Sequence, residues 1–140
     1  MIRRLAHLNF VTTDLPRLRD FYTSTLGLPV KFDFKNDDGE VFGYYIDCGD
    51  SSFIEIFDRD LKTKQWGGAI EELTGGNRYT HFCLEVTDLV TLCDRLIGKG
   101  LDVTEVRQGM DNSLQAWTRD PDGNAIELMQ YTAKSKQIQR

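Results

Sequence analysis

The sequence is poor in several residue types that mark specialised classes of protein. Its 140 residues include only three prolines and three cysteines, and no two cysteines are spaced as CxxC. An odd number of scattered cysteines favours reduced, mostly buried thiols over a disulfide framework. The chain is 40% hydrophobic and 28% charged, which is the balance of a folded globular protein. We therefore expect a single domain of ordinary size, which excludes a multidomain machine.

Basic side chains are also few. Lysine and arginine number 17 against 22 aspartates and glutamates, so the formal net charge is −5. Such a surface repels phosphate backbones and anionic membranes, and we expect no nucleic-acid or membrane partner. No apolar run reaches the length of a signal peptide or a membrane span. The sequence therefore predicts a cytoplasmic protein.

What the sequence does have is an internal repeat. The stretch HLNFVTTDL at residues 7–15 aligns with HFCLEVTDL at 81–89, an offset of 74. Near the end of each repeat, SSFIEI at 51–56 aligns with GNAIEL at 123–128, an offset of 72. Two half-chains of similar length follow from this self-similarity.

Each half begins with an alternating strand and continues with a helix. Asp14 and Asp88 are placed to cap the two helices, and Pro16 is tolerated in a first helical turn. Apolar stripes follow at helical spacing: Leu18, Phe21, Tyr22 and Leu26 before Gly27, then Leu89, Leu92, Leu96 and Ile97 before Gly98 or Gly100. We expect both stripes to cover a sheet.

Short strand-like runs separated by turn residues follow each helix. They are residues 30–34, 41–48 and 53–57 in the first half, and 103–107, 114–118 and 125–131 in the second. The order βαβββ, twice, predicts an α+β fold of two modules. We assign module 1 to residues 1–57, a connector to 58–79 with a short helix at 69–73, module 2 to 80–131, and a frayed polar tail to 132–140, all within one domain.

A histidine on the first strand and a glutamate on the last strand recur in both modules. His7 is followed by Glu55, and His81 by Glu127. By parity, each of the four lies opposite the apolar face that the helices cover. If the two sheets curve toward each other, two imidazoles and two carboxylates can converge on a divalent metal ion.

Taken singly, each of these residues is ordinarily a polar side chain on a half-exposed strand. The chain has only two histidines, however, and both stand at equivalent positions of the repeat with a glutamate at the equivalent end. This symmetry favours the metal site over four unrelated surface residues.

With these residues in place, the chain resembles the vicinal oxygen chelate superfamily, and most closely its short metal-dependent glyoxalase I members. The resemblance extends from Leu5 to Tyr131 and includes the helix end at 21–28 and the stretch DPDGNAIEL at 120–128. It implies paired βαβββ modules whose strands form a curved mixed sheet around a metal-binding cleft. It also implies that His7, Glu55, His81 and Glu127 are the metal ligands.

The implied reaction isomerises the hemithioacetal of a 2-oxoaldehyde and a thiol, normally methylglyoxal and glutathione, to a 2-hydroxyacyl thioester through an enediolate. By the resemblance Glu127 is the catalytic base, with Glu55 as the alternative or second partner. The mixed ligand set accepts Ni²⁺, Co²⁺ or Zn²⁺, and also Mn²⁺ or Fe²⁺. Short members of the family generally form homodimers in which module 1 of one chain faces module 2 of the other.

Further residues are candidates for substrate contact. Phe53, Phe57 and Met129 share the parity of the glutamates and, with Trp66 and Trp117, are candidates to line the cleft. Asn9 and Gln115 are candidates to donate hydrogen bonds to the substrate. Glu85 shares the face of His81 as a solvated or supporting carboxylate.

One position departs from the family pattern. Short glyoxalases usually carry an arginine four residues after the first histidine, where it meets the glutathione carboxylate, and this chain has Val11. The thiol therefore stays open. Basic residues elsewhere are candidates for a different clamp, although each is ordinarily a solvated surface charge: Lys62, Lys64, Arg78, Arg107 and Arg119.

Three other functions share the fold. Extradiol-type dioxygenases bind Fe²⁺ through two histidines and a carboxylate but typically use a further histidine, and none remains here. Fosfomycin-type thiol transferases do not need Glu55 and use a cationic phosphonate pocket that the sequence does not show. Bleomycin-resistance relatives sequester a ligand without turnover and usually lack the metal ligands. The metal content of the purified protein therefore distinguishes such a binding protein from a metal-dependent enzyme.

Overall fold

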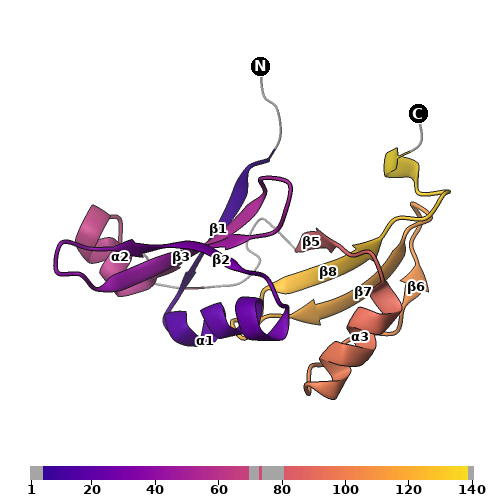
Figure 1. Ribbon diagram of the computed structural model, residues 1–140, viewed down its shortest axis with the longest axis horizontal. Coiled ribbons are helices and arrows are strands. Elements are labelled where there is room, and N and C mark those ends of the chain that lie inside the picture. Colours follow the sequence, from indigo (N-terminus) through magenta and orange to yellow (C-terminus); the bar gives the residue numbers. More distant parts are fainter. Residues whose placement is uncertain (1–4, 70–72, 74–80, 139–140) are drawn as a thin grey trace. The chain divides into compact units, whose positions relative to one another are not determined.

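The chain folds into two compact units, residues 1–74 and 75–140. The computed structural model describes residues 5–69, 73 and 81–138. Figure 1 shows that each unit holds one sheet with a helix packed alongside it. The predicted order βαβββ is present in both units, and the α+β fold class is confirmed.

The first unit has a four-stranded mixed sheet in the order β1-β4-β3-β2. Its strands are β1 (His7–Thr12), β2 (Val30–Lys35), β3 (Val41–Asp47) and β4 (Phe53–Asp58). The pairing of β1 with β4 is parallel, and the other two pairings are antiparallel. In the register, Asn9 stands opposite Glu55, so the first and last strands of the repeat are neighbours.

The second unit repeats this topology in the order β5-β8-β7-β6. Its strands are β5 (Phe82–Glu85), β6 (Arg107–Gln108), β7 (Leu114–Arg119) and β8 (Ala125–Gln130), with β5 and β8 parallel. The strand predicted at 103–107 is reduced to the two residues of β6. Before it, the Thr104 backbone N–H donates to the Trp117 carbonyl at 3.0 Å, and the Thr104 hydroxyl, in place of a backbone carbonyl, accepts the Trp117 N–H at 2.9 Å.

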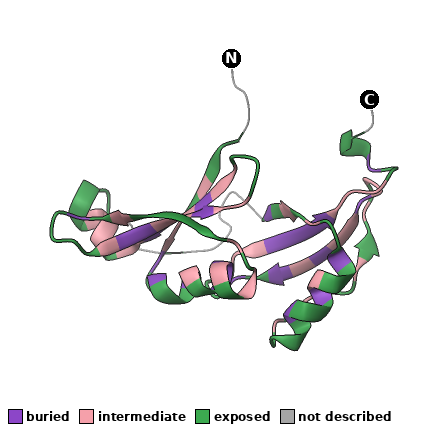
Figure 2. Cartoon of the chain, in the orientation of Figure 1, coloured by how far each residue is buried: buried purple, intermediate pink, exposed green. Residues whose placement is uncertain are grey.

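The repeat helices α1 (Leu15–Asp20) and α3 (Leu89–Gly98) begin where the sequence predicts. The Asp14 and Asp88 carboxylates accept the backbone N–H of Arg17 and Thr91, respectively, and so cap the two helices. Residues Phe21–Thr25 extend α1 as a π-helical turn. Figure 2 shows buried and exposed residues on different sides of α3. Ile97 of the predicted stripe is exposed, and Cys93 is buried in its place.

Two predictions outside the repeats were incomplete. The connector contains a helix, α2 (Arg59–Trp66), that packs on β3 and β4, whereas the helix expected at 69–73 lies mainly outside the described residues. The tail was expected to be frayed, but it is anchored as far as residue 138. Ser135 is fully buried and accepts a hydrogen bond from the Ser113 hydroxyl at 2.8 Å. Among the described residues, no helix is long and apolar enough to cross a membrane.

Candidate metal and substrate site

In the first unit, three polar side chains meet on one face of the sheet. The Nε2 atom of His7 lies 3.7 Å from the Oε2 atom of Glu55. The Asn9 amide donates to the same Glu55 oxygen at 3.1 Å. The Glu55 side chain is 15% exposed and that of His7 is 42% exposed, so the pair is open on the histidine side. The predicted pairing of this histidine and glutamate is therefore present in the structure.

The second unit places an equivalent pair on its own sheet. The Nε2 atom of His81 lies 3.2 Å from the Oε2 atom of Glu127. Glu127 is one of the few buried charged residues, at 8% exposure. Its strand partners in the register are Cys83 on β5 and Trp117 on β7. A nitrogen donor and a carboxylate oxygen thus lie side by side in both units.

The neighbours of the two pairs differ. Cys83 takes the position of Asn9 and places a thiol beside Glu127, where the first unit has an amide beside Glu55. Cys83 is an exposed residue, but partial desolvation of its sulfur, and then the nearby Glu127 carboxylate, raise the pKa of the thiol to about 12. Cys83 is therefore protonated at neutral pH and contributes a weak hydrogen-bond donor.

The geometry of each pair fits metal ligation. Two ligand atoms bound at about 2.1 Å and at a right angle on one ion lie about 3 Å apart, and the two observed N–O separations are 3.2 and 3.7 Å. Within the described residues, no group of three or more histidine, cysteine, aspartate or glutamate side chains is arranged to hold a metal ion. Each unit by itself brings together one nitrogen and one carboxylate oxygen that could bind a metal ion.

The predicted substrate contacts lie in different surroundings. Phe53 is half-buried, with its ring 5.1 Å from that of Tyr45 on the face of Glu55. Phe57 is 5% exposed and packs under Trp66 at 5.3 Å between ring centroids. Met129 is nearly buried, and the Gln137 amide of the anchored tail lies 3.9 Å from its sulfur. Phe53 is thus open to a ligand, whereas Phe57 is covered by another side chain.

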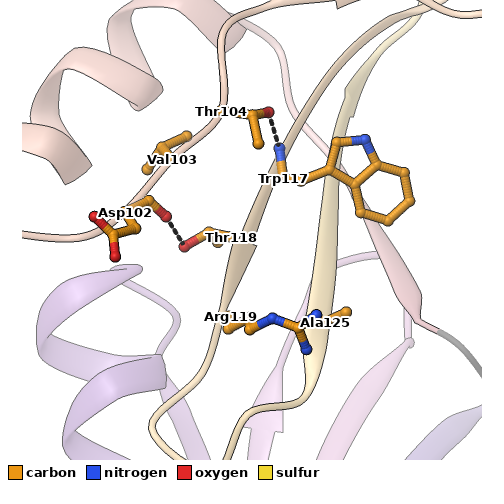
Figure 3. A pocket seen from close by; sticks show the side chains of 7 residues that line it. All are labelled: Asp102, Val103, Thr104, Trp117, Thr118, Arg119 and Ala125. Carbon is orange, nitrogen blue, oxygen red and sulfur yellow. Dashed lines mark hydrogen bonds between the residues drawn. The ribbon is translucent and has the colours of Figure 1, made fainter.

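Two adjoining hollows lie along β7 in the second unit. The first, of about 630 Å³, is lined by residues 102–104 and by residues of β7 and β8 that include Trp117 and Arg119 (Figure 3). The second, of about 520 Å³, is lined by Gln115 and Arg107 and shares Trp117 and Thr104 with the first. Two of the predicted substrate residues, Gln115 and Trp117, therefore line concave surface.

The candidate cations for a substrate clamp interact within their own units. Lys62 donates to the Gly67 and Gly68 carbonyls at the end of α2. Lys64 pairs with Asp38 and Glu40, Arg107 pairs with Glu105, and Arg119 donates to the Gly123 carbonyl. Arg78 lies outside the described residues. Glu85 is exposed on the face of His81.

Tyr45 is a site residue that the sequence reasoning missed. Its hydroxyl lies 2.8 Å from the Nδ1 atom of His7, and it stands opposite Glu55 in the register of β3 and β4. The offset of 72 that relates Glu55 to Glu127 also relates Tyr45 to Trp117, whose ring meets that of His81 edge-on at 4.7 Å. An aromatic residue at this repeat position was the signal that could have identified Tyr45.

Comparisons with known proteins identify the family to which the chain belongs. The Glyoxalase/Bleomycin resistance protein/Dioxygenase superfamily model matches residues 4–128. The lactoylglutathione lyase of Salmonella typhimurium is 30% identical over 134 residues, covering 91% of this chain and 92% of that protein.

Solved structures share the fold. The crystal structure of SMU.1112c superposes with a TM-score of 0.73 at 25% identity, covering 92% of this chain and 99% of that one. TnmS3, an antibiotic binding protein from Streptomyces sp. CB03234, gives a TM-score of 0.69 at 23% identity and covers 94% of this chain and 98% of that one. The chain belongs to the Glyoxalase/Bleomycin resistance protein/Dioxygenase superfamily. The resemblance inferred from the repeated motifs is confirmed.

Proposed function

We propose that this protein is a metal-dependent, glyoxalase I-like carbon–sulfur lyase. Its substrate is the hemithioacetal formed from a 2-oxoaldehyde, such as methylglyoxal, and a thiol, and its product is a 2-hydroxyacyl thioester. The observation that carries the proposal is the repeated pairing of an imidazole Nε2 with a carboxylate oxygen, at 3.7 Å for His7 and Glu55 and 3.2 Å for His81 and Glu127. The similarity to lactoylglutathione lyases over most of the chain supports it.

In this proposal the two pairs together hold one divalent ion. Neutral imidazole nitrogens and carboxylate oxygens suit Ni²⁺, Co²⁺ and Zn²⁺, and they also accept Mn²⁺ or Fe²⁺. A bound ion of this kind would polarise two neighbouring substrate oxygens and stabilise the negative charge that develops when a C–H proton leaves.

The protein's own groups move the proton. The Glu127 carboxylate removes the proton from the thiol-bearing carbon and returns it to the neighbouring carbon, so the isomerisation consumes no other reactant. Glu127 is preferred as the base because the Glu55 Oε2 atom already accepts the Asn9 amide at 3.1 Å. The neighbour of Glu127 at the equivalent position is the Cys83 thiol, which is a weaker hydrogen-bond donor than an amide. Phe53, Asn9, Trp117, Gln115 and Met129 are proposed to line the substrate site. Phe57 is 5% exposed and packs under Trp66.

The proposal does not fix the thiol that forms the hemithioacetal. Val11 is half-buried and stands opposite the buried Phe57 in the register, at the position where the related short glyoxalases usually carry an arginine. An apolar side chain at this point offers no partner to a glutathione carboxylate. The test therefore needs several thiols of different charge.

The deciding experiment is an assay of the full chain after reconstitution with each of the candidate metals. Methylglyoxal is offered with glutathione and with smaller thiols, and thioester formation is followed by absorbance. We expect metal-dependent thioester formation with at least one thiol. Metal binding without thioester formation would contradict the lyase, and ring cleavage of a catechol in air would point to an extradiol-type dioxygenase instead.

A second measurement tests the ligand set itself. His7→Ala or His81→Ala each removes a neutral nitrogen donor, so we expect elemental analysis to find most of the bound metal lost. Glu85→Gln changes an exposed carboxylate on the face of His81 and serves as the control with full metal content. Metal retained by His81→Ala would show that the repeated pairs do not form the metal site.

The location of the protein in the cytoplasm stays a prediction.

A further inference from the structure

The two ring nitrogens of His7 face different groups. Nε2 lies 3.7 Å from the Glu55 carboxylate, and Nδ1 lies 2.8 Å from the Tyr45 hydroxyl. A histidine that binds a metal through one nitrogen carries its proton on the other, and the partner of that second nitrogen fixes the tautomer and the ring orientation. Tyr45 is in position to be this partner.

The Tyr45 ring is held on several sides. Phe32 stacks on it at 4.8 Å with an interplanar angle of 13°, and Phe53 contacts it at 5.1 Å. The ring of His7 itself lies at 5.5 Å. Because these contacts fix the ring, the hydroxyl has little freedom to move away from His7. The contacts also involve the ring alone, so removing the hydroxyl leaves them in place.

We propose that Tyr45 is a positioning residue for His7. Its hydroxyl oxygen accepts the Nδ1–H of the imidazole and so directs the Nε2 lone pair toward a divalent ion beside Glu55. The proposal rests on the metal site of the proposed function, and it adds a residue that acts on a ligand rather than on the ion or the substrate.

The second unit holds its histidine differently. Trp117, at the repeat position of Tyr45, presents its ring to His81 at an interplanar angle of 77°. The indole N–H is a donor only, so this side chain cannot accept an imidazole proton as a tyrosine hydroxyl can. The effect of removing a hydroxyl is therefore specific to His7.

The test compares Tyr45→Phe with Tyr44→Phe in the full chain. Tyr44 is the matched control because its hydroxyl accepts from Arg19 at 3.2 Å, away from His7. The dissociation constant for Zn²⁺ is measured by competition with a chromophoric chelator. We expect Tyr45→Phe to bind Zn²⁺ about 10- to 100-fold more weakly, the usual effect of losing a partner of a metal-binding histidine, and Tyr44→Phe to match the parent.

A spectroscopic readout separates positioning from a general structural effect. In the Zn²⁺-loaded parent, the His7 Nδ1–H proton should be visible by ¹⁵N-edited NMR and should exchange slowly with water. In Tyr45→Phe it should exchange faster, while the thermal midpoint of the metal-free protein stays unchanged. Parental Zn²⁺ affinity together with unchanged proton exchange in Tyr45→Phe would overturn the proposal.

The outcomes also distinguish this proposal from the lyase. Zn²⁺ binding by the parent without thioester formation contradicts the lyase alone, and the comparison of Tyr45→Phe with Tyr44→Phe still decides the role of Tyr45. A parent that takes up none of the candidate divalent metals overturns both.

Discussion

The two glutamates of the repeat occupy equivalent positions but have different neighbours. Glu55 accepts the Asn9 amide at 3.1 Å, whereas Glu127 lies beside a thiol and is more buried. We therefore expect Glu127→Gln to lose most turnover while it keeps part of its metal, because an amide oxygen still coordinates weakly but cannot accept the proton. The measurement is kcat beside metal content for each variant.

Glu55→Gln is the matched comparison for that prediction. It should retain more activity than Glu127→Gln at equal metal occupancy, since Glu55 is assigned mainly to ligation. Near-complete loss of kcat in Glu55→Gln with little change in Glu127→Gln would reverse the assignment of the base.

The Cys83 thiol gives a prediction about pH. Partial desolvation of the sulfur and the Glu127 carboxylate raise its pKa to about 12, so only a small thiolate fraction exists at neutral pH and alkylation should be slow. Replacing Glu127 by Gln removes a negative charge that disfavours the thiolate, which lowers the pKa. In metal-free protein, the pH profile of Cys83 alkylation by iodoacetamide should therefore shift to lower pH in Glu127→Gln.

Cys48 is the internal reference for this experiment. Burial is the largest cause that raises its pKa, to about 11, and Glu127 is not among the causes. Its alkylation profile should be the same in both proteins, and peptide mass spectrometry distinguishes the two cysteines. A Cys83 profile that does not move would show that Glu127 is not close enough to influence it.

At the residue scale, the sequence predicted the two histidine–glutamate pairs because strand parity and the repeat offset fix which face a side chain occupies. Strand parity alone could not predict the contact of Asn9 with Glu55, because this contact depends on the parallel register of β1 and β4. The repeat could have marked Tyr45 as a site residue, but not its contact with His7. The Tyr45 hydroxyl meets His7 across β4, the strand between them, which only the sheet order reveals.

A close approach of two elements is visible at Gly43 on β3. A Cβ atom at this position would overlap the ring of Phe57 on β4 and lie 2.7 Å from the Ile56 carbonyl oxygen. Phe57 in turn packs against Phe34 and Trp66, so its ring has little room to move. We expect Gly43→Ala to destabilise the protein by about 1–3 kcal/mol, the usual cost of overpacking, in urea unfolding.

Gly98→Ala is the control for this substitution. Gly98 is the last residue of α3, and a Cβ atom there would meet nothing within 4 Å. Alanine at this place should be neutral or stabilise the protein by up to about 1 kcal/mol, because it favours the helix. Equal stability of the Gly43→Ala protein and the parent would mean that the Phe57 ring moves aside without cost.

The elements that the sequence predicted well are those with a periodic apolar face. The helix α2 was missed because none of its residues is buried, so it carries no apolar stripe. Its ends were nevertheless marked, since Asp58 caps its start and Gly67 closes it at a φ of 73°. The tail was misjudged for a different reason: the buried Ser135 hydroxyl accepts from the Ser113 hydroxyl and from the Thr132 backbone N–H, which hydropathy cannot show.

On the scale of the whole molecule, the repeat accounts for most of what was predictable. Each unit supplies half of the proposed ligand set, one nitrogen and one oxygen, so a complete site needs one unit of each kind. Two such units can come from one chain or from two. The superfamily resemblance favours a homodimer, and we expect a mass near 32 kDa, twice 16.1 kDa, by sedimentation.

Mixing two inactive variants tests which units share a site. If the first unit of one chain faces the second unit of its partner, a hybrid of His7→Ala and Glu127→Gln chains contains one undamaged site and one doubly damaged site. Random exchange makes half of the dimers hybrid, so activity should return to roughly a quarter of the parental value. A mixture of His7→Ala with Glu55→Ala is the control, because both changes lie in the first unit and every shared site stays damaged. If exchange is proven by mass labelling and the first mixture stays inactive, each chain closes its own site.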